Sequence, residues 1–469
     1  MKNLKKTLAL LAALALSASA LYGCGKETSS SSTTAKDSSS AADSSKETDE
    51  SSTDSGESAE GDQLTILCWN KDDSQPMVDL FCEKTGVSPS KINIKSFGVQ
   101  GGQAAEQYDQ YLGNAENDAD IMFLEADWCL KYINDDNMTI PLSELGFQDS
   151  DFDAIYPYVK EIGKSTETGA LKGISWQSAA GGYCYREDLA ETYLGVKTPE
   201  EMQAKVKDWD AFKATAKELS DATGGKTALS ATLGGVWQVY SGSRDTAWVD
   251  ADNKLVVDDY CKDYAEFAKE LWNNGYVTKV AQWDQAWLPL GQTDDVMGFF
   301  VSTWGFGDTI LTGAAGGEGG KTFGKWKCVT GPMEFYWGGT WMAPAKTCNN
   351  KELAKQFIEF FTVDEENAKA YALKKGEYMS NKNVMESIIS EKSYAGAPVL
   401  GGQNQFEVLN EVAAGIDMTG KITPYDATIK TQFSTVVQEY ADGTIATVDE
   451  ALETFKDNVA AALPDLNWD

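Results

Sequence analysis

The chain has 469 residues and a formal net charge of −32, with 40 Lys and Arg, 72 Asp and Glu, and no histidine. A surface this acidic repels nucleic acid and anionic lipid, so we exclude both as partners. Without histidine the chain lacks the commonest general base and the commonest transition-metal ligand, and we expect neither a metal nor a cofactor.

Residues 1–23 have the pattern of a secretory signal peptide. Basic MKNLKK precedes an apolar run that is too short to span a membrane. Residues 21–24, LYGC, resemble the bacterial lipoprotein cleavage box, although Tyr22 replaces the small residue usual there. This resemblance implies that Cys24 is lipidated, which places the protein on the extracellular face of the cell membrane. The alternative is a plain signal peptide with an accidental cysteine.

Residues 24–61 contain no aromatic residue and consist largely of Ser, Thr and acidic residues. They cannot bury enough apolar surface to offset the entropy lost on ordering, so we predict a disordered tether. A tether this long suits a cell wall without an outer membrane and favours a Gram-positive host. The remaining stretch, about 400 residues, is long enough for one large two-lobed body, which we expect to be a monomer.

Strands alternate with helices in the first part of this body. Apolar runs predict strands at 64–69, 92–97 and 120–124, and helices at 76–85 and 103–114 lie between them. This order predicts an α/β fold with mostly parallel sheets flanked by helices. Ligands bind beyond the carboxyl ends of such strands. The polar and aromatic residues at those ends are Trp69, Asp72, Glu125, Asp127 and Trp128.

Aromatic residues continue through the second half of the chain. We interpret 229–240 as a strand and an aromatic loop that contains Trp237, and 281–287 as a loop that contains Trp283. After Gly338 and Gly339, an apolar run at 340–343 predicts a strand, and helices follow at about 349–361 and 364–375. Residues 385–469 are predicted to be helical, with Thr447 capping the last helix.

The order of several segments resembles the extracellular solute-binding proteins of ABC importers, in their carbohydrate-binding branch. These segments are DIMFLEADW at 120–128, YREDL at 185–189, KDWDAFKATAKEL at 207–219, DVMGFFVSTW at 295–304 and NNKELAKQFIEFF at 349–361. The resemblance covers most of residues 62–469. It implies a two-lobed fold of the type II periplasmic-binding-protein class, joined by a hinge. We expect lobe 1 at 62–180 plus 296–343 and lobe 2 at 181–295 plus 344–469.

The resemblance also implies a function without catalysis. Such a protein captures a sugar or oligosaccharide between its lobes and delivers it to permease subunits. It implies that Asp127 accepts sugar hydroxyls and Trp304 stacks on the sugar, while Trp128 departs from the arginine of the maltose-binding members. The full set of expected ligand-binding residues is Trp69, Asp72, Glu125, Asp127, Trp128, Trp176, Trp237, Trp283, Trp304, Trp341 and Tyr425.

Two other functions remain open from the sequence. The same fold can bind a cationic small molecule such as a polyamine, because carboxylates and aromatic rings also suit cations. A secreted glycoside hydrolase would need two carboxylates on either side of a cleft, and acidic residues are plentiful.

Apart from Cys24, seven cysteines remain without a C-x-x-C pair. We expect buried free thiols, although a bridge between Cys68 and Cys82 stays open.

Overall fold

The computed structural model describes residues 63–99 and 103–468, which lie within one compact unit, Ser58–Asp469. The signal peptide and the whole of the tether, including Cys24, therefore fall outside the described residues. In the described part of the chain, no helix combines the length and apolar character needed to cross a membrane.

The first sheet contains five strands in the order β2-β1-β3-β9-β4. Their bounds are β1 (Leu64–Cys68), β2 (Ile92–Ser96), β3 (Ile121–Glu125), β4 (Ile174–Ser175) and β9 (Thr340–Pro344). The strands β1, β2 and β3 are parallel, whereas β9 runs antiparallel to both β3 and β4. The four strands predicted from apolar runs are confirmed; β1, β3 and β9 are almost wholly buried, whereas β2 is largely half-buried.

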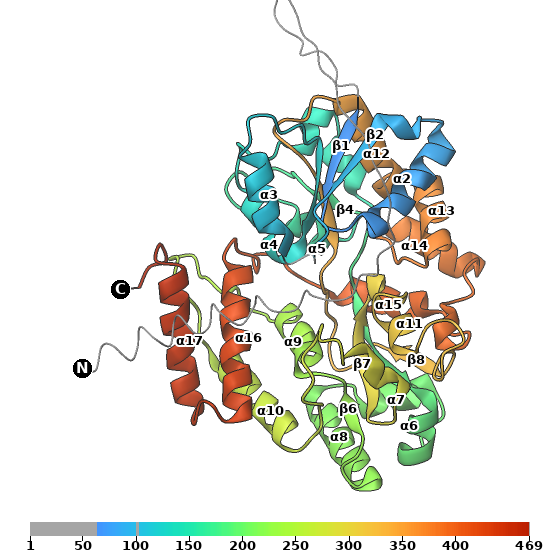
Figure 1. Ribbon diagram of the computed structural model, residues 1–469, viewed down its shortest axis with the longest axis vertical. Helices are drawn as coiled ribbons and strands as arrows, with labels where there is room; N and C mark the ends of the chain where they lie inside the picture. The colour runs from blue at the N-terminus through green and yellow to red at the C-terminus, as the bar shows by residue number, and fades with distance from the viewer. Residues whose placement is uncertain (1–62, 100–102, 469) are drawn as a thin grey trace, which may run out of the picture. The chain divides into compact units, whose positions relative to one another are not determined.

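Helices of the N-terminal part surround this sheet (Figure 1). They are α2 (Lys71–Thr85), α3 (Ala104–Leu112), α4 (Ala126–Ile133) and α5 (Pro157–Ile162). The helix expected at 76–85 begins five residues earlier, because the side chain of Asn70 accepts a hydrogen bond from the backbone N–H of Asp72 and caps the helix there. The first turn of α2 thus follows β1 directly.

The second sheet contains four strands in the order β6-β7-β5-β8. They are β5 (Gly181–Arg186), β6 (Ala228–Ser230), β7 (Val296–Ser302) and β8 (Trp326–Val329). Only β6 and β7 are parallel, since β5 runs antiparallel to β7 and to β8. The predicted α/β class is confirmed, but both sheets are mixed rather than mostly parallel. The cause is that β9 and β5 arrive from the other sheet and enter in the opposite direction.

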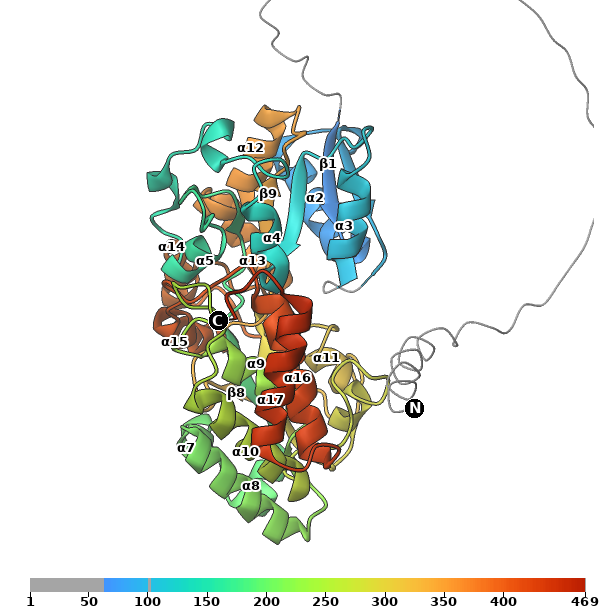
Figure 2. The same cartoon turned by 90° about the vertical axis from the view of Figure 1, so that its left-hand side faces the viewer.

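The helices packed around the second sheet come from the middle and the end of the chain. They are α6 (Glu187–Leu194), α7 (Pro199–Lys205), α8 (Trp209–Thr223), α9 (Leu233–Gly242), α10 (Asp259–Asn273), α11 (Leu311–Ala314), α15 (Gln405–Gly415), α16 (Asp426–Asp442) and α17 (Val448–Ala462). Figures 1 and 2 both show α16 and α17 side by side, and α10 packs against them. The prediction for 229–240 was right for the strand, which is the end of β6, and wrong for the aromatic loop, since α9 occupies most of this range. The Thr232 side chain caps α9 by accepting from Gly235 N–H.

The division into lobes differs from the one expected from chain order. Residues 296–329 contain β7 and β8 of the second sheet, although we expected 296–343 in the first lobe. Helices α12 (Lys351–Thr362) and α13 (Glu365–Lys375) contact β4 and α2 respectively, although we expected 344–469 in the second lobe. Chain order alone does not reveal which sheet a strand joins, whereas strand pairing does.

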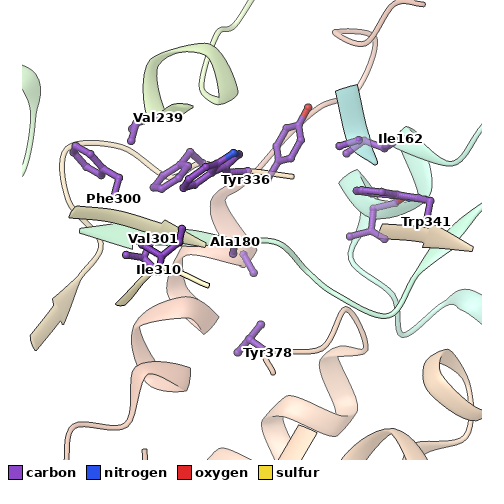
Figure 3. Close-up of a cluster of buried hydrophobic side chains, with 14 of the residues drawn as sticks. Ile162, Ala180, Val239, Phe300, Val301, Ile310, Tyr336, Trp341 and Tyr378 are labelled. Carbon is purple, nitrogen blue, oxygen red and sulfur yellow. The ribbon is translucent and has the colours of Figure 1, made fainter. Parts of the chain in front are cut away.

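Three segments run together where the chain passes between the sheets: 176–181, 335–339 and 376–381. The first links β4 to β5, the second precedes β9, and the third links α13 to α14 (Lys382–Glu391). Backbone hydrogen bonds join 176–181 to both neighbours, from Ser178 N to Tyr378 O, Ser380 N to Trp176 O, Gly181 N to Phe335 O and Trp337 N to Ala179 O. Figure 3 shows Ala180, Tyr336 and Tyr378 between Trp341 on one side and Phe300 on the other, so buried side chains continue across these crossing segments.

Candidate functional site

Two glycines place an acidic residue of the first sheet next to an indole of the second. Gly338 has φ +63° and Gly339 has φ +100°, values that L side chains rarely adopt. A Cβ atom on Gly338 would lie 3.3 Å from Trp304 Nε1 and 3.6 Å from Glu125 Oε1. Glu125 ends β3 and Trp304 follows β7. The bare backbone at Gly338 therefore lets these two side chains approach from different sheets.

Trp304 belongs to a group of four tryptophans in ring contact, which we term the indole cluster: Trp283, Trp287, Trp304 and Trp337. The rings of Trp283 and Trp304 are nearly parallel, with centroids 6.3 Å apart and an angle of 15°. Trp337 meets Trp304 edge-on at 4.9 Å, and its backbone oxygen accepts a hydrogen bond from Trp304 Nε1 at 2.9 Å. Trp283 is 52% exposed and has φ +70°, which is rare for a bulky residue. The cluster therefore presents one exposed indole ring, that of Trp283, which packs against the rings of Trp287, Trp304 and Trp337.

Beside the indoles lies a group of charged and phenolic side chains, the acid–lysine cluster: Glu125, Asp127, Tyr336, Asp426 and Lys430. Asp127 on α4 and Lys430 on α16 form an ion pair of 3.0 Å. Burial raises the pKa of Glu125 to about 8, and the Asp127 charge adds to the rise while Lys430 opposes it. Burial also raises the pKa of Asp426 to about 6. At neutral pH the cluster thus contains both a protonated and an ionised carboxyl group.

Lys430 stays charged in this setting. Burial alone would lower its pKa, but the charges of Asp127 and Asp426 and the phenol of Tyr336 raise it well above its usual range. Its side chain is only 15% exposed, compared with 47% for Asp127. The carboxylate therefore faces both the lysine and the solvent.

Unpaired polar atoms gather where the crossing segments meet the end of β7. Gln177 Nε2 donates to Glu377 Oε2 at 3.0 Å. The other carboxyl oxygen of Glu377, the hydroxyl of Thr303 and Nε1 of Trp176 are buried without a partner of hydrogen-bond geometry. Thr303 lies close enough to lower the pKa of Glu377, which burial raises. Because buried polar atoms are nearly always paired, these atoms are suited to contact a ligand or water.

The donor types in this region favour an organic ligand. Among the residues that the structure describes, no three His, Cys, Asp or Glu side chains gather in a way that could hold a metal ion. The site instead combines flat apolar rings with hydrogen-bonding oxygens and nitrogens, which is typical of small-molecule sites with a few oriented polar groups.

A family model described as bacterial extracellular solute-binding protein matches residues 77–398. The chain belongs to this family. A comparison of this solute-binding protein with curated protein sequences found no match. Solved structures share its two-lobed α/β fold. One is described as an extracellular solute-binding protein of family 1, with a TM-score of 0.74 and 18% identity, covering 85% of this chain and 99% of that one.

Two further similar structures hold sugars. The ABC transporter associated binding protein from B. animalis subsp. lactis Bl-04, in complex with beta-1,6-galactobiose, has a TM-score of 0.66 and 17% identity and covers 86% of this chain and 98% of its own. Maltose-bound MalE3 from T. maritima has a TM-score of 0.62 and 16% identity. This match covers 86% of this chain and 100% of that one. At these identities the likeness establishes the fold.

The structure brings together only part of the residue set expected from the sequence of this solute-binding protein. Glu125 and Trp304 lie at Gly338, Asp127 is hydrogen-bonded to Glu125, and Trp283 stacks with Trp304. Tyr425 is partly buried and directly precedes Asp426 of the acid–lysine cluster.

The remaining expected residues lie apart or deeper. Trp69 and Trp128 meet edge-on at 6.3 Å next to β1 and α4, and Asp72 is exposed in the first turn of α2. Trp176 is 4% exposed and packs on Phe123.

Two expected residues are core residues in the structure of this solute-binding protein. Trp341 is fully buried, and its Nε1 donates to Val159 O at 2.9 Å. Trp237 packs against Trp248, Tyr264 and Phe433 between α9, α10 and α16. The ring of Trp341 lies against Gly339, where a Cβ atom would be 3.1 Å from it, but it is fully buried, and Trp237 is enclosed by protein contacts.

Sequence reasoning missed several residues of the two clusters and of the crossing segments: Trp287, Thr303, Tyr336, Trp337, Glu377, Asp426 and Lys430. Trp337 directly precedes Gly338 and Gly339, so the sequence does offer an indole next to two glycines as an indication of a site residue. Lys430 lies on a surface helix far along the chain from Asp127, and no local pattern marks it.

Proposed function

We propose that this solute-binding protein captures a sugar or oligosaccharide between its two sheets and delivers it to the permease of an ABC importer. The observation that carries the proposal is the indole cluster, with Trp283 exposed, next to the acid–lysine cluster. A sugar ring has apolar C–H faces and a belt of hydroxyl groups, which match flat indoles and hydrogen-bonding side chains respectively. Sugars in two of the similar solved structures support this choice.

Each cluster has a distinct part in this proposal. Trp283 and Trp304 cover a face of the sugar. Asp127 accepts from a hydroxyl group, and Glu125, protonated near neutral pH because its pKa is about 8, donates to another. The unpaired atoms of Thr303 and Glu377 provide hydrogen bonds at the crossing segments.

A cationic ligand fits these charges less well. Asp127 is already paired with Lys430, and Glu125 is neutral near pH 7, so a polyamine would meet few free negative charges. A neutral sugar needs no counter-charge. The family and fold are those of binding proteins, and we propose that the ligand leaves chemically unchanged.

The test is ligand binding by the purified full-length protein. We would measure thermal unfolding and calorimetric titration with galactobiose, maltose, longer oligosaccharides and spermidine. A ligand at about a hundred times its dissociation constant stabilises the protein by roughly 2.7 kcal/mol. Trp304→Ala should abolish the response. Trp468→Ala is the matched control, since Trp468 is an exposed indole (41%) near the C-terminus.

The outcomes separate the three functions. A sugar that binds wild type and Trp468→Ala but not Trp304→Ala, and is recovered intact, supports the proposal. Binding of spermidine alone would replace the ligand class. Shorter sugar products after long incubation would indicate a glycoside hydrolase, because a binder leaves the glycosidic bond intact.

We also propose that the protein is held at the outer face of the membrane by lipid on Cys24. The cleavage box at 21–24 supports this, and the absence of a spanning helix among the described residues is compatible with it. In cells that express the chain, Cys24→Ala should move it from the membrane fraction to the medium. Retention of Cys24→Ala in the membrane fraction would contradict lipid anchoring at this residue.

A further inference from the structure

Two buried cysteines face each other across neighbouring strands of the second sheet. The antiparallel register of β5 and β8 pairs Cys184 with Cys328, and both side chains are fully buried. Among the described strands, no other two cysteines share a register position. Their thiols are therefore neighbours in space although they are far apart in the chain.

The backbone of Cys328 shows which type of pair this is. Its N–H donates to Gln403 Oε1 at 2.6 Å, and its carbonyl oxygen accepts from Gln403 Nε2 at 2.7 Å. Both backbone groups thus point away from β5. In an antiparallel sheet this defines a non-hydrogen-bonded pair, in which Cα atoms are about 4.5 Å apart and side chains are closest. That separation lies within the range that a disulfide spans.

Gly182 of β5 leaves space for the sulfur of Cys328. A Cβ atom on Gly182 would lie 2.8 Å from Cys328 Sγ, so the glycine provides the space that this sulfur occupies. Burial and the adjacent Cys328 thiol both raise the pKa of Cys184. The two cysteine side chains therefore interact with each other in a buried site.

We propose that Cys184 and Cys328 form a cross-strand disulfide when the protein meets an oxidising disulfide compound. One thiolate attacks the compound and forms a mixed disulfide, releasing one thiol. The second thiolate then displaces the other half, so two protein thiols and one disulfide compound give one protein disulfide and two small thiols. The buried sulfurs react when β8 opens, which its position at the edge of the sheet allows. The bond then fixes β8 to β5, the strand into which the crossing segment 176–181 leads.

Peptide mapping of the full-length protein tests this directly. Trypsin places Cys184 in peptide 173–186 and Cys328 in peptide 328–346, each with a single cysteine. We would equilibrate the protein with mixtures of reduced and oxidised glutathione, both folded and during refolding from urea. After alkylation and digestion, we expect the two peptides joined under oxidising conditions and separate after reduction. Cys68, a buried thiol opposite Ser96, is the internal control and should stay alkylated.

A second measurement compares melting temperatures of the oxidised and reduced protein. Wild type should melt several degrees higher when oxidised, whereas Cys184→Ala should show no redox-dependent shift. Full alkylation of both cysteines at every glutathione ratio, or Cys328 joined to a different cysteine, would overturn the proposal. The peptide map uses wild-type protein, so the result stands even if Cys184→Ala folds poorly.

Discussion

Glu125 offers the sharpest test of the electrostatics at the site. Its carboxyl group caps α4 by accepting from the backbone N–H of Asp127 at 3.0 Å. Replacing Glu125 by Gln keeps an oxygen that can accept this bond and removes the titrating group. The variant therefore separates the cost of ionising a buried carboxyl from the loss of a helix cap.

The expected magnitude follows from the pKa of Glu125, which burial raises from 4.5 to about 8. A pKa change of one corresponds to about 1.36 kcal/mol, so the full rise corresponds to roughly 4.8 kcal/mol. Glu125 keeps part of its surface in contact with solvent, and screening reduces the figure to about 2–3 kcal/mol. Between pH 4.5 and about 8 the folded state binds more protons than the unfolded state. This contribution to stability is therefore present in acid and lost as the pH rises through about 8.

The assay is urea unfolding of wild type and Glu125→Gln from pH 4.5 to 9. The two proteins should have nearly equal free energies of unfolding at the acid end, and the variant should be about 2–3 kcal/mol more stable at the alkaline end. Glu453→Gln, at an exposed position of α17, is the matched control and should show no such divergence. A difference between Glu125→Gln and wild type that is constant with pH, or that favours wild type in alkali, would refute the reasoning.

Three further substitutions test the packing and the ion pair, each measured by urea unfolding. Lys430→Met removes the cation that faces Asp127 and Asp426. Because burial raises the pKa of Asp426 to about 6, the loss should be about 1 kcal/mol at pH 8 and less at pH 5, and equal losses at both would contradict it. Gly338→Ala should cost about 1–2 kcal/mol because of its positive φ, whereas Gly307→Ala, in open space, should be neutral. Trp341→Ala should cost about 3–5 kcal/mol, since this indole is fully buried, and a loss below 1 kcal/mol would mean that its site collapses.

Local sequence patterns correctly predicted the strands whose own residues are apolar enough to require burial. The runs that became β1 and β3 are uniformly apolar, and full burial of such runs in a sheet is their stable state. The segment that became α9 is different. Its Val, Trp and Tyr residues favour strands and its glycines disfavour helices, yet the Thr232 cap and burial between β7 and α10 make it helical.

The site was predictable only where chain order and strand ends determine position. Glu125 and Asp127 follow a predicted parallel strand, so the rule for strand ends identified them. Trp341 was misleading because it lies within a strand, where a side chain points into the core rather than past the sheet. Lys430 and Glu377 reach the site from helices and crossing segments whose docking depends on long-range packing.

Under the proposed function, the positions of Glu125 and Trp304 determine how a ligand would close the two lobes. A sugar that contacts Glu125 and Trp304 together touches the ends of β3 and β7, one in each sheet, and it therefore binds a closed arrangement better than an open one. Moving a population from 1:99 to 99:1 takes about 5.5 kcal/mol of differential affinity. The Asp127–Lys430 pair also joins the two parts, but its half-exposed carboxylate limits it to about 1 kcal/mol or less. The ion pair alone is too weak to hold the lobes together, so contacts made by the sugar with the indoles and the unpaired polar atoms must supply most of the closing free energy.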